Sequence, residues 1–171
     1  ILVQGVTNLK KVEHEIISDR IVAGTYIIAA LMLNSALEIN NFNTIYLKSL
    51  IDILKKMGAK LKVSNNSIKV FKGSKLKSSS LSTSPYPGFP TDLQAQLMSL
   101  MCISDGKSKI KETIFENRFM HVPELNRLGA NITVEKDTAS IIGNQTFKGA
   151  QVMASDLRAV SYTHLRAHET I

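Results

Sequence analysis

The 171-residue chain is poor in residues on which several classes of protein depend. Its single cysteine, Cys102, excludes an intrachain disulfide framework and is typical of a reducing compartment. The longest apolar run, Tyr26–Leu33, is far shorter than the roughly 20 residues that a membrane-spanning helix needs. The first residues lack the basic leader, apolar core and cleavage site of a signal peptide. We therefore expect a cytoplasmic protein that does not contact a membrane.

Tryptophan is absent and aromatic residues make up 6% of the chain, whereas the net charge of +7 makes it clearly basic. A basic protein can bind nucleic acid, an acidic membrane surface or phosphorylated small molecules. The lysines are scattered apart from a cluster within residues 69–77, and no basic strip is interleaved with aromatic side chains. The composition thus favours small anionic substrates and no nucleic acid, with a nucleic-acid binder as the weakest alternative.

Apolar periodicity predicts a mixed helix and strand pattern in the first half of the chain. The expected elements are a helix opened by Asp19 and ended by Asn34 and Ser35, a strand at 37–39, an amphipathic helix at 47–57 closed by Gly58, and a hairpin of residues 61–63 and 68–70. Residues 1–18 are expected to be extended, and residues 74–84 to be a connection.

The same order of elements recurs after 71 residues, the separation of Gly58 and Gly129. This shift also places Ile39 on Ile110 and Val63 on Val134. A repeat of this length predicts an internal duplication of helix–strand–helix–strand–strand units. The expected organisation is a preceding segment at 1–18, a first unit at 19–84, a second unit at 85–155 and the start of a third at 156–159.

Residues 85–118 are the strongest candidate for a functional site. Three prolines and a glycine within residues 85–90 make a stiff turn. Thr91 or Asp92 then occupies the position of a helix N-cap, and Arg118 follows a strand predicted further on, at 109–115. A carboxylate and a guanidinium at the ends of elements can form a reaction site, although a capping aspartate and a surface arginine are also common structural residues.

Three long motifs occur in the order found in the enolpyruvyl transferase family. They are PYPGFPTDLQAQ at 85–96, ETIFENRFMHVPELNRLGA at 112–130 and GAQVMASDLRA at 149–159, and VEHEIISDRIVAGTY at 12–26 precedes them. Within that family, roughly residues 5–159 resemble the UDP-N-acetylglucosamine 1-carboxyvinyltransferases. The run ENRFMHVPEL argues against the sister enzymes that act on shikimate 3-phosphate, which stay as an alternative.

The resemblance implies an α/β fold, the inside-out α/β barrel of the enolpyruvyl transferases, with two lobes of three repeated units each. Residues 1–18 would then end the first lobe, and the repeats would be the first two units of the second lobe. The barrel is expected to be incomplete in this chain. Residues 160–171 depart from the family pattern and are interpreted as an artificial tail. His164 and His168 within it have no third ligand, so no metal site is predicted.

The resemblance also implies a reaction. The enolpyruvyl group of phosphoenolpyruvate would move to the 3′-hydroxyl of UDP-N-acetylglucosamine with release of phosphate, the first committed step of peptidoglycan precursor synthesis. No metal or organic cofactor is implied, and the complete enzyme is expected to be a monomer. The 171 residues alone are expected to be inactive, because the family's reactive-cysteine loop belongs to the first lobe. A non-catalytic repeat module that binds sugar nucleotides is a further alternative.

Two aspartates match catalytic positions of the family. Asp92 matches the proposed base for the sugar hydroxyl, and Asp156 matches an aspartate implicated in proton transfer to the substrate methylene. Helix capping remains the structural alternative for Asp92. Cys102 lies in an apolar run and is expected to be a buried small hydrophobic residue rather than a nucleophile.

Four further residues match substrate-binding positions. Arg118 and Arg158 match arginines that bind anionic substrate groups, for which a planar guanidinium is well suited. Ile114 and Phe115 match a wall that contacts the sugar nucleotide. Burial in the core is the alternative for both apolar residues.

Overall fold

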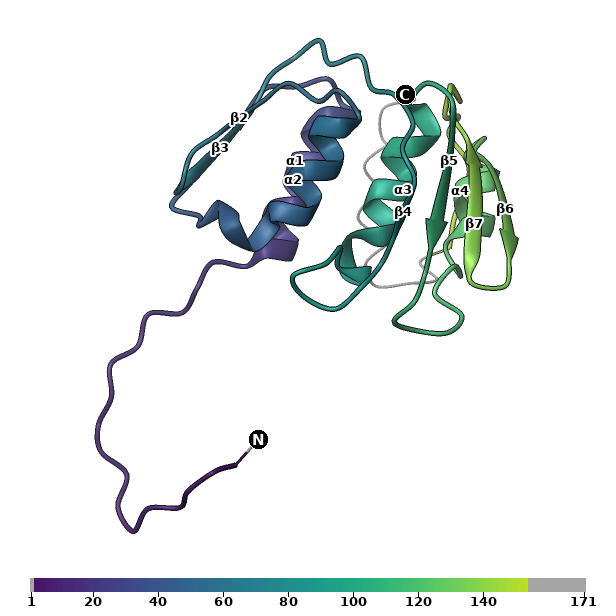
Figure 1. Ribbon diagram of the computed structural model, residues 1–171. Helices are drawn as coiled ribbons and strands as arrows, with labels where there is room; N and C mark the ends of the chain where they lie inside the picture. Colours follow the sequence, from purple (N-terminus) through teal and green to yellow (C-terminus); the bar gives the residue numbers. More distant parts are fainter. Residues whose placement is uncertain (1, 154–171) are drawn as a thin grey trace.

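The computed structural model describes residues 2–153 of the chain, which form two successive α/β units (Figure 1). Ile1 and residues 154–171, including Asp156, Arg158, His164 and His168, lie outside the described residues. Residues 2–18 are extended and run away from both units, as expected from their sequence. Within the described residues, no helix has the length and hydropathy needed to cross a membrane.

The first unit contains two helices and one three-stranded sheet. Its helices are α1 (Arg20–Met32) and α2 (Lys48–Lys56), the latter preceded by a 3₁₀ turn at Thr44–Leu47, and its strands are β1 (Leu37–Asn40), β2 (Leu61–Val63) and β3 (Ser67–Val70). The strands are antiparallel in the order β1-β3-β2, so β3 is central.

The second unit has the same plan with one added strand. Its helices are α3 (Gln94–Ile103), preceded by a 3₁₀ turn at Thr91–Leu93, and α4 (Val122–Arg127); its strands are β4 (Leu81–Ser82), β5 (Lys107–Lys111), β6 (Asn131–Glu135) and β7 (Thr138–Ile142). The sheet order is β4-β5-β7-β6, with β4 parallel to β5 and the other pairs antiparallel.

The two sheets share one register after a shift of 71 residues. Leu37 lies opposite Val70 in the first sheet, and Ser108 lies opposite Ile141 in the second. The β2–β3 and β6–β7 pairs are related by the same shift. A slip of one residue would have turned every side chain to the opposite face. The predicted duplication is therefore confirmed at the level of individual strand pairs.

The ends of the helices follow their sequence signals in three places. Asp19 caps α1, because its Oδ1 accepts hydrogen bonds from the amides of Ile21 and Val22 at 2.7 and 3.1 Å. Gly58 and Gly129 follow α2 and α4 with φ angles of 92° and 100°. This left-handed conformation favours glycine, which has no Cβ.

The N-cap predicted after the proline turn is wrong. Residues 91–93 form a 3₁₀ turn capped by Pro90, and α3 begins at Gln94 with no side-chain cap. The Thr91 hydroxyl donates instead to Glu112, and the Asp92 carboxylate accepts from Arg118. Both side chains therefore bind residues distant in the sequence instead of capping the helix.

Two strand predictions also differ from the structure. The strand expected at 109–115 ends at Lys111, because the amides of Ile114 and Phe115 donate to the Glu112 carboxylate rather than to a neighbouring strand. The connection expected at 74–84 contains β4, which is only two residues long. A strand of this length is too short to show the alternation of apolar and polar residues from which strands are predicted.

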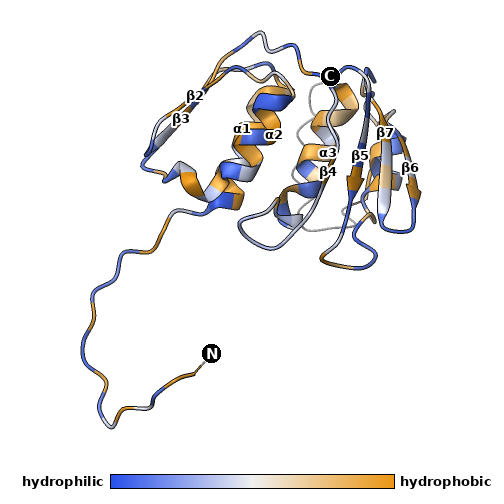
Figure 2. Cartoon of the chain, viewed as in Figure 1, coloured by the Kyte–Doolittle hydropathy of each residue, from blue (hydrophilic) through white to orange (hydrophobic). Residues whose placement is uncertain are grey.

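The core lies where the helices of the two units meet. Helices α1 and α3 pack against each other between the two sheets (Figure 1), and hydrophobic residues run along both (Figure 2). Every residue of α3 from Gln94 to Cys102 is buried. Helices on the inside and sheets on the outside are the arrangement predicted as an inside-out α/β barrel.

Gly143, directly after β7, lies in close contact with the backbone that follows α3. A Cβ at this position would lie 1.8 Å from the carbonyl oxygen of Ser104 and 2.8 Å from that of Gly106. Overpacking against backbone costs about 1–3 kcal/mol or more, so Gly143→Ala should lower the melting temperature by several degrees in a circular dichroism scan. Gly5→Ala is the control, because nothing lies within 4 Å of its added Cβ. Equal melting temperatures for the two variants would contradict this packing.

Candidate functional site

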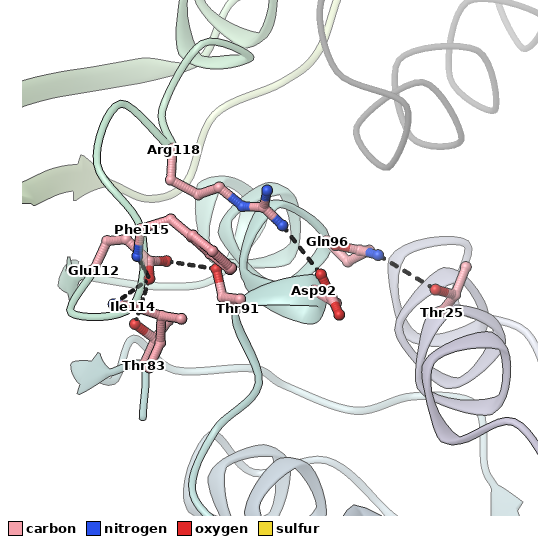
Figure 3. A network of polar contacts seen from close by, with 9 residues as sticks. All are labelled: Thr25, Thr83, Thr91, Asp92, Gln96, Glu112, Ile114, Phe115 and Arg118. Atoms are coloured by element: carbon pink, nitrogen blue, oxygen red, sulfur yellow. Dashed lines mark hydrogen bonds and ion pairs between the residues drawn. The ribbon is translucent and has the colours of Figure 1, made fainter. Parts of the chain in front are cut away.

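Asp92 and Arg118 meet at the N-terminal end of α3. Figure 3 shows the two side chains pointing toward each other from the 3₁₀ turn and from the loop that follows β5. Arg118 Nη2 donates to Asp92 Oδ1 at 3.0 Å. The Arg118 side chain is 17% exposed and that of Asp92 is 39% exposed, so the carboxylate faces solvent while the guanidinium is largely enclosed.

The Arg118 guanidinium is also held by an aromatic face. Its central carbon lies 5.3 Å from the centre of the Phe115 ring, within the range of a cation–π contact. Asn117, just before Arg118, has a φ of 53°, a conformation that asparagine tolerates better than most residues. This turn directs Arg118 back toward α3.

Ile114 and Phe115 lie beyond the end of β5 rather than inside a strand. Ile114 is half-buried and Phe115 is exposed, so core burial, the structural alternative for both residues, does not hold for Phe115. Together with Arg118 they line an open hollow of about 690 Å³. A ligand can therefore reach this loop.

Further charged groups lie at the rim of the hollow. Lys111 and Asp137 line it and form an ion pair with an Nζ–Oδ2 distance of 3.5 Å. The Thr138 hydroxyl donates to Asp137 and, with the nearby Lys111 ammonium, holds the pKa of this carboxyl below its usual value. Asp137 is therefore ionised at neutral pH.

Asp92 borders a second hollow on the side of the first unit. This open space of about 710 Å³ is also lined by residues 16–21, Tyr46 and Tyr86. The guanidinium of Arg20 stacks on the Tyr86 ring at 5.0 Å. Arg118 therefore borders the first hollow and Asp92 borders the second.

The sequence analysis did not single out Glu112, which organises the loop before Arg118. Its carboxylate joins Thr83, Thr91 and the amides of Ile114 and Phe115 in one network (Figure 3). A glutamate that follows a short strand carries no local signal for such a role. Among residues 2–153, no group of three or more His, Cys, Asp or Glu side chains comes together as metal ligands.

The fold of the described residues is that of the enolpyruvyl transferases. The solved structure of the enolpyruvyl transferase NikO from Streptomyces tendae superimposes with a TM-score of 0.78 at 26% identity, over 88% of this chain and 36% of that one. The chain belongs to the family described as EPSP synthase (3-phosphoshikimate 1-carboxyvinyltransferase), whose family model matches residues 1–168.

Curated relatives are more similar in sequence. The UDP-N-acetylglucosamine 1-carboxyvinyltransferase of Pelagibacter ubique is 50% identical over 157 residues, which are 92% of this chain and 38% of the relative. The corresponding enzyme of Desulfosudis oleivorans is 48% identical over 159 residues, 93% of this chain and again 38% of the relative. The chain therefore spans well under half the length of these relatives.

Cys102 is not part of the site. It is fully buried in α3, and burial raises the pKa of its thiol to about 12, as expected for a small hydrophobic residue in the core. At pH 8 the reactive thiolate is therefore only about one ten-thousandth of the population.

We expect the native chain to resist alkylation by iodoacetamide at pH 8. In urea the thiol should regain its ordinary pKa and react within minutes, which mass spectrometry would record as one added carbamidomethyl group. Rapid modification of the native chain at pH 8 would contradict the burial of Cys102.

Proposed function

We propose that the complete protein to which this chain belongs transfers the enolpyruvyl group of phosphoenolpyruvate to the 3′-hydroxyl of UDP-N-acetylglucosamine, releasing phosphate. The Asp92–Arg118 pair, held at 3.0 Å beside an open hollow, carries the proposal. Relatives at 46–50% identity named for this activity support it. In the cell, the reaction would be the first committed step of peptidoglycan precursor synthesis, carried out in the cytoplasm by a monomer.

Asp92 is suited to act as the base on the sugar hydroxyl. A general base must lie within hydrogen-bonding distance of the proton that it takes, and the Asp92 carboxylate is exposed enough to meet a substrate. It lies on the 3₁₀ turn directly before α3, whose residues 94–102 are all buried, so its position is well defined. Proton transfer of this kind contributes roughly 10²- to 10⁴-fold to a rate.

Arg118 is suited to bind the anionic groups of the substrates. A guanidinium has five N–H donors in a fixed plane, so a single contact with Asp92 leaves it able to bind a phosphate or carboxylate. Ile114 and Phe115 would form the wall against which the sugar nucleotide lies.

The remaining roles fall on residues outside the described part of the chain. We propose that Asp156 takes part in proton transfer at the substrate methylene and that Arg158 binds the carboxylate of phosphoenolpyruvate. In this scheme residues 1–18 end the first lobe, 19–84 and 85–155 are two units of the second, and 156–159 begin the next unit. The family's first lobe would supply the reactive-cysteine loop.

Shikimate 3-phosphate is the alternative acceptor, because the family model carries the name of the enzyme that uses it. The ENRFMHVPEL run and the names of the relatives favour UDP-N-acetylglucosamine. Phosphate release with each acceptor in turn distinguishes the two.

Asp92→Asn in the complete transferase should lower kcat by roughly 10²- to 10⁴-fold, because the amide cannot accept the hydroxyl proton. A phosphate-release assay measures the rate, and circular dichroism checks that the fold is kept. Asp105→Asn is the matched control, since this exposed aspartate binds Asn144 at the opposite end of α3. Retention of wild-type turnover by Asp92→Asn would refute the role of base.

Arg118→Lys should raise the KM for phosphoenolpyruvate roughly tenfold or more, because a lysine offers a point charge instead of a planar pair of donors. Steady-state kinetics at saturating UDP-N-acetylglucosamine measures this change. Arg127→Lys is the control, because that side chain is 62% exposed and contacts only Glu124 among the ion pairs found in residues 2–153. Unchanged kinetics in Arg118→Lys would remove Arg118 from the substrate site.

A further inference from the structure

Glu112 is a buried carboxylate directly after β5, with 4% of its surface exposed. Its Oε1 accepts hydrogen bonds from Thr83 Oγ1 at 2.8 Å, from the amide of Ile114 at 2.9 Å and from that of Phe115 at 3.4 Å. Its Oε2 accepts from Thr91 Oγ1 at 2.9 Å. Both carboxylate oxygens are thus in use.

These donors come from three separate segments that form the candidate site. Thr83 follows β4 and bridges to Phe89 at the far side of the proline turn. Thr91 opens the 3₁₀ turn and immediately precedes Asp92. The amides of Ile114 and Phe115 belong to the loop that leads to Arg118, so one carboxylate ties together both sides of the site (Figure 3).

The contacts of the Thr83 hydroxyl show that it is the donor in its hydrogen bond with Glu112. Thr83 is 1% exposed, and its Oγ1 accepts from the amide of Thr113 at 2.9 Å. The hydroxyl proton of Thr83 is therefore directed to Glu112. The donors found to Glu112 within residues 2–153 are neutral groups. Removing one of these hydrogen bonds from a buried carboxylate raises the free energy of the folded protein. This cost resists any movement of the loop relative to the turn.

We propose that Glu112 is a positioning residue of the transferase site, whose carboxylate sets the geometry between Asp92 and the Ile114–Phe115 wall. It acts through Thr91 on one side and through the two loop amides on the other, and it does not touch the substrate. The inference rests on the function proposed above and adds a residue on which acceptor binding and turnover depend.

Three substitutions of Glu112 distinguish the effect of its hydrogen bonds from the effect of its negative charge. Glu112→Gln keeps an oxygen for Thr83, Ile114 and Phe115, and its amide can donate to Thr91 Oγ1, whose hydroxyl can rotate to accept. Glu112→Asp is one methylene shorter and cannot reach all of its donors. Glu112→Ala removes every contact. The expected order of activity is therefore wild type and Gln, then Asp, then Ala.

In the complete transferase, we expect Glu112→Ala to lower kcat/KM for UDP-N-acetylglucosamine by roughly 30-fold or more, and Glu112→Gln to stay within about threefold of wild type. Glu124→Ala is the matched control: Glu124, on α4, is a second buried glutamate, 8% exposed, whose carboxylate accepts a hydrogen bond from the amide of Met153. It should lower the melting temperature without a comparable loss of kcat/KM.

A second readout does not depend on activity. In ¹H–¹⁵N spectra of the 171-residue chain, the amide signals of Ile114 and Phe115 should shift and exchange faster in Glu112→Ala, and stay near their wild-type positions in Glu112→Gln. If Glu112→Ala does not fold, Thr91→Val removes one donor alone and should give a smaller loss of the same kind.

Each possible outcome bears on a different part of the proposal. Equal losses in Glu112→Ala and Glu124→Ala would overturn a positioning role, as would a loss in Glu112→Gln as large as that in Glu112→Ala. Unchanged Ile114 and Phe115 amide signals in a folded Glu112→Ala would overturn the contacts themselves. A complete wild-type protein that transfers no enolpyruvyl group would overturn the proposed function, and with it the positioning role of Glu112 in that reaction, even where the amide signals behave as expected.

Discussion

Direct packing of α1 against α3 is the contact on which the arrangement of the two units depends. Gly24 of α1 allows close contact with the 3₁₀ turn that leads into α3, because a Cβ there would lie 2.6 Å from a methyl group of Leu93. Beside Gly24, Thr25 Oγ1 accepts a hydrogen bond from Gln96 Nε2 at 3.4 Å, a contact between positions that are one 71-residue repeat apart. Because residues 94–102 of α3 are all buried, the turn that carries Asp92 is attached to a helix enclosed by the core.

The duplication explains why so much of the fold could be predicted. Each unit has apolar residues at helical spacing and short alternating strands. The same order of elements can therefore be predicted separately from each copy and compared. The register of β1 with β3 and of β5 with β7 follows from that repeat, because a slipped strand would expose Ile39 or Ile110. Element boundaries were less predictable, since the end of β5 is decided by the side chain of Glu112.

The candidate site was predictable only in part, for the same physical reason. Nothing local distinguishes Asp92 from a capping aspartate or Arg118 from a surface arginine, and the resemblance to a family is what favoured a functional role for both. The structure brings Arg118 to Asp92 across 26 positions of sequence. Glu112 was missed because Thr83 and Thr91, which both donate to its carboxylate, lie 29 and 21 residues before it, and hydrophobic periodicity carries no information about a buried hydrogen-bond network.

The unequal burial of the Asp92–Arg118 pair suits the proposed reaction, in which the site would bind anions and then move a proton. An ion pair with one partly exposed member is worth about 1 kcal/mol or less, whereas a charge-assisted hydrogen bond to a substrate is worth roughly 1.5–3 kcal/mol. An arriving phosphate or carboxylate can therefore replace Asp92 on Arg118 at little cost. Because the guanidinium is held by Phe115 and the loop by Glu112, the proposed exchange would break the Arg118–Asp92 contact without moving the arginine. In the proposed reaction, Asp92 would then accept the proton of a substrate hydroxyl beside it.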